Sequence, residues 1–155
     1  MRGRIEAIAV TVGCLIGIFF LAKWISGDDG TTKIDPKLQP LVEEWITTME
    51  SSGMSDARER LGKVHQIKLA SIETLSGAEP LGVTTIDGDV IKINERILSR
   101  DLMKNTLFHE LGHALFSLDH TIEGIMNCSQ DIDGPYPIND PDKLKQYINQ
   151  CLASR

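Results

Sequence analysis

The segment TLFHELGHALFSLDHTIEGIMN, at residues 106–127, constrains the fold of this chain more than any other. His109 and His113 are four residues apart, so on a helix they lie one turn apart on the same face. Glu110 directly follows the first histidine. Two neutral imidazoles at this spacing can bind one metal ion together, and the adjacent carboxylate can accept a proton beside it. The spacing therefore predicts a helix with one metal-binding face.

Two later residues extend this pattern. His120 stands in the segment LDH, and Met126 follows six residues later in the segment GIMN. Here the chain resembles the metzincin metallopeptidases, above all the matrixin-like and small bacterial members, whose pattern H-E-x-x-H-x-x-G-x-x-H precedes a turn with methionine. The resemblance covers about twenty residues. It implies that His109, His113 and His120 bind Zn²⁺, and that Met126 lies beneath the metal without binding it.

The sequence departs from the family pattern by one residue. Phe116 stands where the family has glycine, and Asp119 stands at the third histidine position, with His120 one residue later. On an unbroken helix His120 would lie about 10 Å further along the axis than His113, at about 1.5 Å per residue. Bonds of about 2.0 Å to one ion cannot span that distance. The helix is therefore expected to end between Phe116 and Leu118.

The pattern leaves more than one choice for the third metal ligand. We favour His120, because an imidazole matches the donor set of the resembled family. Asp119 is the alternative, and a later carboxylate such as Glu123 is a further one, since carboxylates also bind zinc. Whichever of His120 and Asp119 is not a ligand is expected to turn outward or to orient a ligand.

Length and charge limit the classes of function. The 155 residues suffice for one domain with a short appendage. The net charge of −6 argues against a nucleic-acid partner, because contacts to phosphates need basic residues. The hydrophobic fraction of 41% is ordinary for a soluble protein, but much of it is concentrated near the N-terminus.

The N-terminal apolar segment is expected to cross a membrane. Residues 7–22 carry no charge, and apolar residues continue past Lys23, which is long enough for a hydrocarbon core of ~30 Å. Basic residues precede the segment and acidic residues follow it, so its N-terminus is expected in the cytoplasm and the remaining chain outside. A cleaved secretory signal is the alternative. The predicted order is a cytoplasmic N-terminus (1–6), a transmembrane anchor (7–26), a linker (27–34) and a domain (35–155).

The cysteines agree with export of the domain. Cys14 lies in the apolar segment, which leaves Cys128 and Cys151 as a pair outside it. An even number of cysteines outside the membrane favours one disulfide, which would attach the C-terminal helix to the methionine turn. Two free thiols are the alternative.

Local patterns predict the elements of the domain. Asp35 and Pro36 are expected to cap and begin a helix that reaches about Ser51, and residues 52–60 are expected to form a loop or short turn. Asp87 and Gly88 between two apolar runs indicate a tight hairpin. In the resembled family a strand beside the cleft pairs with extended substrate, so one hairpin strand is expected to do so. The other predicted elements are a strand at 64–69, hairpin strands at 83–86 and 90–93, a helix at 97–117 and a last helix from Pro141.

Together these features predict an α+β domain of the zincin type, with a reduced β-sheet and about three helices. The expected function is that of a membrane-anchored zinc endopeptidase that cleaves protein or peptide substrates. Glu110 would act as general base, taking a proton from water and returning it to the leaving amine. The alternatives are an inactive or structural zinc-binding module, and a membrane adaptor in which the motif is accidental. The sequence specifies neither one substrate nor an oligomeric state.

Overall fold

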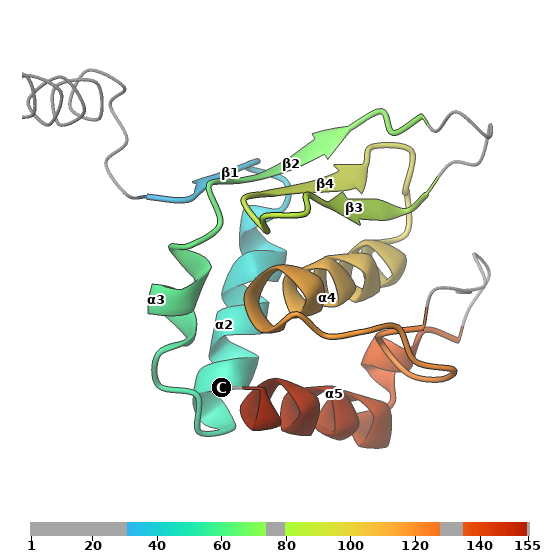
Figure 1. The fold of residues 1–155 in the computed structure, drawn as a ribbon. Coiled ribbons are helices and arrows are strands. Elements are labelled where there is room, and N and C mark those ends of the chain that lie inside the picture. Colours follow the sequence, from blue (N-terminus) through green and yellow to red (C-terminus); the bar gives the residue numbers. More distant parts are fainter. Residues whose placement is uncertain (1–30, 74–79, 128–134, 155) are drawn as a thin grey trace, which may run out of the picture. The chain divides into compact units, whose positions relative to one another are not determined.

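The computed structural model of this protein describes residues 31–73, 80–127 and 135–154 (Figure 1). The predicted cytoplasmic N-terminus at 1–6 and membrane anchor at 7–26 lie outside these residues. Within the described residues, no helix combines the length and the apolar character needed to cross a membrane. Residues 32–155 belong to one structural unit, which contains all the elements described below.

The helices largely follow the apolar periodicity of the sequence. All three predicted helices are present, and the long central one lies inside its predicted range. The segment at 52–60 was predicted as a loop or short turn, and this prediction was wrong from Ala57 onward, where a short fourth α-helix begins. The helices of the described residues are α2 (Gln39–Ser51), α3 (Ala57–Leu61), α4 (Arg100–Phe116), the 3-10 helix η1 (Pro137–Asn139) and α5 (Pro141–Ala153).

Helix α2 begins later than predicted. Asp35 was expected to cap it, but its carboxylate accepts a hydrogen bond of 2.9 Å from the main-chain nitrogen of Lys37. The Asp35 carbonyl accepts two more, from Leu38 and Gln39 at 2.9 and 3.1 Å. These bonds form a separate turn, and the helix starts after it, with Pro40 in its first turn. Proline fits there because the first turn has no partner for its missing N–H.

The sheet is small and mixed, as the predicted α+β class requires. Its four strands are β1 (Lys33–Ile34), β2 (Gln66–Ala70), β3 (Gly82–Thr84) and β4 (Val90–Asn94), in the order β1-β2-β4-β3. Strands β1, β2 and β4 are parallel, and β3 pairs antiparallel with β4. The predicted hairpin is confirmed, and Gly88 at its turn has a φ of 76° that glycine adopts readily. The hairpin makes β3 an edge strand.

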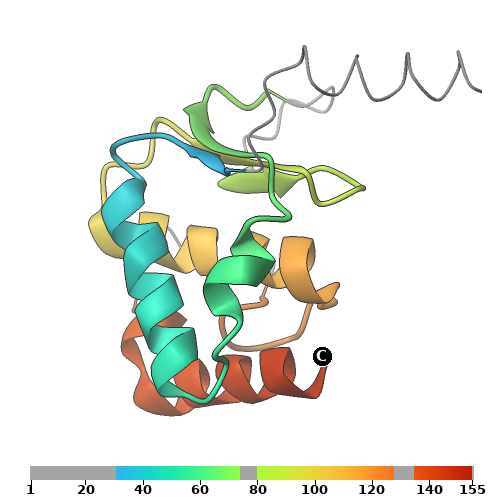
Figure 2. The same ribbon diagram turned by 90° about the vertical axis from the view of Figure 1, so that its left-hand side faces the viewer.

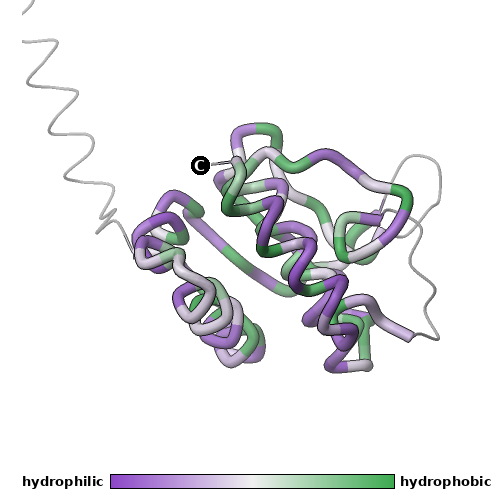
Figure 3. The backbone as a smooth tube through the Cα atoms, turned by 90° about the horizontal axis from the view of Figure 1, so that it is seen from below, coloured by the Kyte–Doolittle hydropathy of each residue, from purple (hydrophilic) through white to green (hydrophobic). Residues whose placement is uncertain are grey.

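Helix α4 lies between the sheet and α5. In Figure 1 the sheet covers one side of α4 and α5 lies on the other, and Figure 2 shows the same order after a turn of 90°. Hydrophilic and hydrophobic residues alternate along the helices (Figure 3). Leu107, Phe108 and Leu111 of α4 are fully buried. Because α4 is packed on both sides, its orientation relative to the sheet is fixed.

Hydrogen bonds inside the core connect three helices. The indole nitrogen of Trp45 in α2 donates to the hydroxyl oxygen of Tyr147 in α5 over 3.2 Å. The same hydroxyl donates to the main-chain oxygen of Phe108 in α4 over 2.7 Å. Buried polar groups are costly unless paired, so these two bonds restrict how α2 and α5 can pack on α4.

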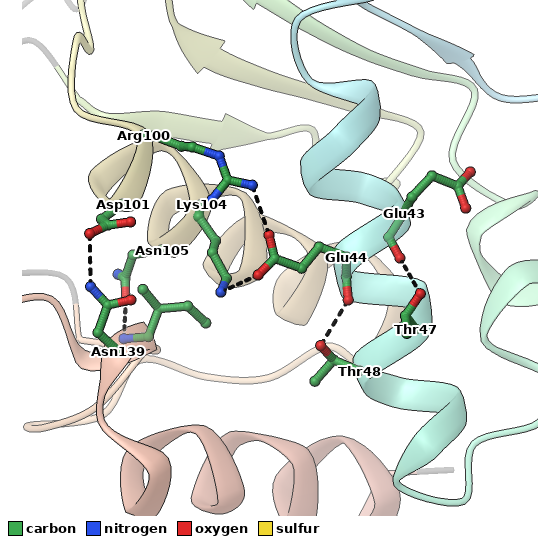
Figure 4. A network of polar contacts seen from close by, with 10 residues as sticks. Glu43, Glu44, Thr47, Thr48, Arg100, Asp101, Lys104, Asn105 and Asn139 are labelled. Carbon is green, nitrogen blue, oxygen red and sulfur yellow. Dashed lines mark hydrogen bonds and ion pairs between the residues drawn. The ribbon is translucent and has the colours of Figure 1, made fainter.

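The N-terminal half of α4 also contacts α2 through charges. The Glu44 carboxylate forms ion pairs with Arg100 over 3.1 Å and with Lys104 over 2.6 Å (Figure 4). On the opposite side, the buried Asn105 accepts a hydrogen bond of 3.0 Å from the main-chain nitrogen of Ile138. Partly exposed ion pairs contribute about 0–1 kcal/mol each, so the buried amide contact is the stronger constraint.

The predicted disulfide is not formed by Cys151. This residue is a free cysteine with a fully buried side chain in α5. Its expected partner, Cys128, lies outside the described residues. Burial raises the pKa of the Cys151 thiol to about 12, and a hydrogen bond with Tyr147 opposes the shift. Cys151 thus serves as a small core residue between α5 and the rest of the domain.

Candidate metal centre

The metal-binding face depends on where α4 ends. The helix starts after Ser99, whose hydroxyl accepts a hydrogen bond of 3.3 Å from the Leu102 nitrogen, and it ends at Phe116. Ser117 then adopts a left-handed conformation with φ 52° and ψ 36°. The Leu118 nitrogen donates back to the Gly112 carbonyl over 3.2 Å, which completes the reversal. The predicted end of the helix between residues 116 and 118 is confirmed.

Phe116, which stands at the glycine position of the H-E-x-x-H-x-x-G-x-x-H pattern, packs against two neighbouring helices. Its side chain is buried, with its ring centroid 6.4 Å from that of Trp45. The Arg60 guanidinium of α3 lies 5.6 Å from the centre of the same ring. The residue at the glycine position therefore anchors the end of α4 to α2 and α3, and Ser117 turns the chain.

This reversal brings the three predicted histidines together. The Nε2 atom of His113 lies 3.0 Å from that of His109 and 3.1 Å from that of His120. The third pair, His109 and His120, is separated by 3.3 Å. These three side chains form a group that could hold a metal ion, and among the described residues the group does not include Asp119.

The other ring nitrogens show which tautomers are present. His109 Nδ1 lies 2.8 Å from the Ile125 carbonyl oxygen, and His113 Nδ1 lies 2.6 Å from the Leu118 carbonyl oxygen. A carbonyl oxygen can only accept a hydrogen bond, so both Nδ1 atoms must carry the proton. In the neutral rings the Nε2 atoms then present lone pairs to one another. Such a convergence of lone pairs is unfavourable without a cation, and a metal ion satisfies it.

The charge state of the rings agrees with this arrangement. Burial lowers the pKa of His109 to about 4, although its hydrogen bond to Ile125 opposes the shift. Burial also lowers the pKa of His113. Both rings are therefore neutral at pH 7, as a metal ligand has to be.

Glu110 lies beside this group and is itself only 5% exposed. Burial raises the pKa of its carboxyl group to about 7, and a hydrogen bond from Thr84 opposes the shift. The Thr84 hydroxyl lies 2.6 Å from Glu110 Oε2. A carboxyl group with a pKa near neutrality can both accept and release a proton at physiological pH.

The methionine turn lies under α4. Met126 is buried, and its sulfur lies 2.7 Å from the position that a Cβ atom on Gly112 would occupy. The preceding residue, Ile125, accepts the hydrogen bond from His109. Gly112 therefore permits the turn that contains Met126 to approach α4 closely. The Ile125 carbonyl of the same turn orients His109.

A cleft of about 690 Å³ opens over the histidines and Glu110. Strand β3 and the hairpin turn form one wall, and α4 with the segment after it forms the other. Of the two hairpin strands, β3 lies at an edge of the described sheet, and all of its residues line the cleft. Asp119 also lines the cleft, near the histidines but outside their group.

Sequence reasoning did not identify Thr84 or Gly82 as residues of this site. Gly82 lies against the Glu110 side chain, since a Cβ atom there would be 2.7 Å from Oε1. Both residues belong to β3, and only its packing on α4 brings them to the site. No pattern in the neighbouring sequence indicates that these two residues lie near the H-E-x-x-H segment. A glycine at the start of a hairpin strand does suggest the close approach of another group.

Comparison with models of protein families, with curated proteins and with solved structures finds no match to this chain.

Proposed function

We propose that this protein is a zinc endopeptidase of the metzincin type, held at a membrane by its apolar segment 7–26. The observation that carries the proposal is the convergence of His109, His113 and His120 beside Glu110 in an open cleft. The resemblance of the segment HELGHALFSLDH to the metzincin pattern supports the same assignment.

The histidines fit Zn²⁺. Zinc binds imidazole nitrogens at about 2.0–2.1 Å in tetrahedral geometry, which places ligand atoms roughly 3.3 Å apart. The three Nε2 separations of 3.0, 3.1 and 3.3 Å are close to that spacing. Three protein ligands leave one position open, as in catalytic rather than structural zinc sites. When bound, Zn²⁺ would polarise the substrate carbonyl group and lower the pKa of the attacking water.

Glu110 moves the proton. Its carboxylate removes a proton from the attacking water, and the protonated side chain later returns that proton to the nitrogen of the leaving amine. A pKa of about 7 suits both steps, because neither protonation state is strongly favoured near neutral pH.

The substrate is an extended peptide segment. Among the residues that the structure describes, strand β3 pairs with β4 alone, and it lines the cleft. An extended chain can add to such an edge through main-chain hydrogen bonds, which largely ignore side-chain identity. Peptide bonds in unfolded or exposed segments are therefore the expected target.

The test uses the full chain, purified in detergent and loaded with Zn²⁺, with fluorophore-labelled casein as probe. The wild type is expected to bind about one Zn²⁺ per chain and to cleave the probe. Glu110→Gln should keep the metal and lose at least about 100-fold in rate, since a positioned general base contributes about 10²–10⁴-fold. Glu95→Gln, the same change at an exposed position outside the cleft, should leave the rate unchanged. A Glu110→Gln variant that cleaves casein as fast as the wild type would refute the proposal.

A further inference from the structure

The side chain of Thr84 reaches from β3 to the central residue of the proposed mechanism. Its hydroxyl oxygen lies 2.6 Å from Glu110 Oε2 and 3.1 Å from the Glu110 main-chain oxygen. Both distances allow hydrogen bonds, and the one to the carboxylate is the shorter. The two residues lie on different elements, so only the packing of β3 on α4 creates the contact.

Gly82 restrains the same side chain at the other carboxylate oxygen. A Cβ atom on Gly82 would lie 2.7 Å from Glu110 Oε1 and 2.8 Å from its Cγ atom. The Glu110 side chain is therefore pressed against the β3 backbone on one side and hydrogen-bonded to Thr84 on the other. A glutamate has three rotatable bonds, so fixing its side chain costs rotamer entropy. Strand β3 supplies the contacts that fix it.

We propose that Thr84 is a positioning residue, whose hydroxyl holds the Glu110 carboxylate in the orientation required for proton transfer. This inference rests on the proposed peptidase function. The hydroxyl donates to Oε2, so in this proposal Oε1 exchanges the proton. The O–H bond of the attacking water breaks as its proton bonds to Oε1. The bond to Oε1 breaks again as an N–H bond forms on the leaving amine.

The contact can persist through the whole cycle. While Glu110 is ionised, Thr84 donates to one of two equivalent carboxylate oxygens. When Oε1 carries the proton, Oε2 is the carbonyl oxygen of the acid and still accepts a hydrogen bond. The orientation set by Thr84 is therefore the same before and after proton uptake, and the side chain need not reorganise between steps.

The kinetic test compares two substitutions at this position, with casein as probe. Thr84→Val keeps the size of the side chain and removes the hydroxyl, so kcat is expected to fall about tenfold or more, with KM within about twofold and zinc content unchanged. Thr84→Ser restores the hydroxyl and should recover most of kcat. Thr32→Val is the control, because Thr32 also bonds a distant carbonyl, that of Leu61 at 2.9 Å, but away from the cleft. Equal losses in Thr84→Ser and Thr84→Val, or loss of zinc in Thr84→Val, would overturn the proposal.

A second measurement detects the contact without activity. Thermal unfolding of the metal-free full chain is compared for Thr84→Val, Glu110→Ala and the double variant. If the two side chains interact, Thr84→Val lowers the unfolding midpoint in the wild-type background and changes it less in the Glu110→Ala background. Equal shifts in both backgrounds would overturn the contact and with it the proposal. If the two substitutions are coupled but the wild-type protein cleaves no casein, the contact exists and the proposed peptidase function is wrong. The positioning role would then be refuted as well, because it rests on that function.

Discussion

The Nδ1 atom of His109 lies 2.8 Å from the carbonyl oxygen of Ile125, the residue before Met126. This hydrogen bond connects the helix that carries two histidines to the turn that follows the third. It fixes the ring orientation and leaves Nε2 free to bind a metal ion. The segment that follows α4 thus supplies His120 and, through the Ile125 carbonyl, orients His109.

The identity of the third ligand can be tested by thermal unfolding with Zn²⁺. At a concentration of about 100 times the dissociation constant, Zn²⁺ should stabilise the wild type by about 2.7 kcal/mol. If His120→Ala weakens binding about 100-fold, the same concentration stabilises that variant by only about 0.4 kcal/mol. Asp119→Ala, the same truncation at the neighbouring exposed residue, should respond like the wild type. The opposite result would make Asp119 the ligand.

Because the methionine turn packs closely against Gly112, we expect Gly112→Ala to lower the stability of the protein. Alanine favours a helix over glycine by about 1 kcal/mol, but its Cβ atom would lie 2.7 Å from the Met126 sulfur and 3.2 Å from Tyr147 Cε2. Overpacking of a core costs about 1–3 kcal/mol, so we expect net destabilisation of about 1 kcal/mol in urea unfolding. In a Met126→Ala background the closest contact is absent and the substitution should be neutral or stabilising. A stabilising effect in the wild-type background would contradict the packing described here.

Because the Cys151 thiol is buried, we expect it to resist alkylation in the native protein. With its pKa raised to about 12, the thiol stays protonated at pH values where an ordinary cysteine has begun to ionise. At pH 8 only about one molecule in 10⁴ carries the thiolate, and burial also excludes the reagent. Iodoacetamide should therefore leave the Cys151 peptide unmodified in the native chain at pH 8 and alkylate it fully in urea, as measured by mass spectrometry. Rapid native modification would show that α5 opens or packs differently.

The sequence predicted features that depend on neighbours along the chain. The hairpin followed from Asp87 and Gly88, and the end of α4 followed from the distance that His120 had to cover. The helical spacing of His109 and His113 required only the geometry of one helix. In each case local backbone rules leave few alternatives.

Features that depend on distant contacts were missed. Strand β1 has only two residues, and they fell within the predicted linker. This strand forms because it pairs with β2, beginning with a hydrogen bond from the Lys33 nitrogen to the His65 carbonyl just before β2. Helix α3 has five residues, too few for a clear apolar period. Thr84 meets Glu110 only through packing of an edge strand on α4. Pairing and packing across many residues leave no fixed spacing in the sequence, so no pattern could have placed these residues.

The left-handed conformation of Ser117 leads us to expect that glycine at this position would stabilise the protein. Its φ of 52° is unfavourable for a residue with a Cβ atom, by about 1–2 kcal/mol, and glycine adopts it without this cost. Ser117→Gly is therefore expected to stabilise the metal-free protein by about 0.5–1 kcal/mol in urea unfolding, after allowance for the greater entropy of glycine in the unfolded chain. Ser117→Val should destabilise it, because a β-branched side chain tolerates this region worst.

The matched control for Ser117→Gly is Ser52→Gly at the end of α2, where φ is −92°. Glycine relieves no strain there and removes a hydrogen bond of 2.8 Å from the Ser52 hydroxyl to the Thr48 carbonyl, so this variant should lose stability. Stabilisation at position 117 with destabilisation at position 52 would show that the reversal at Ser117 stores strain that glycine relieves. Equal effects at both positions would mean that the chain reverses by another conformation, and the convergence of His120 with the other two histidines would then need a different explanation.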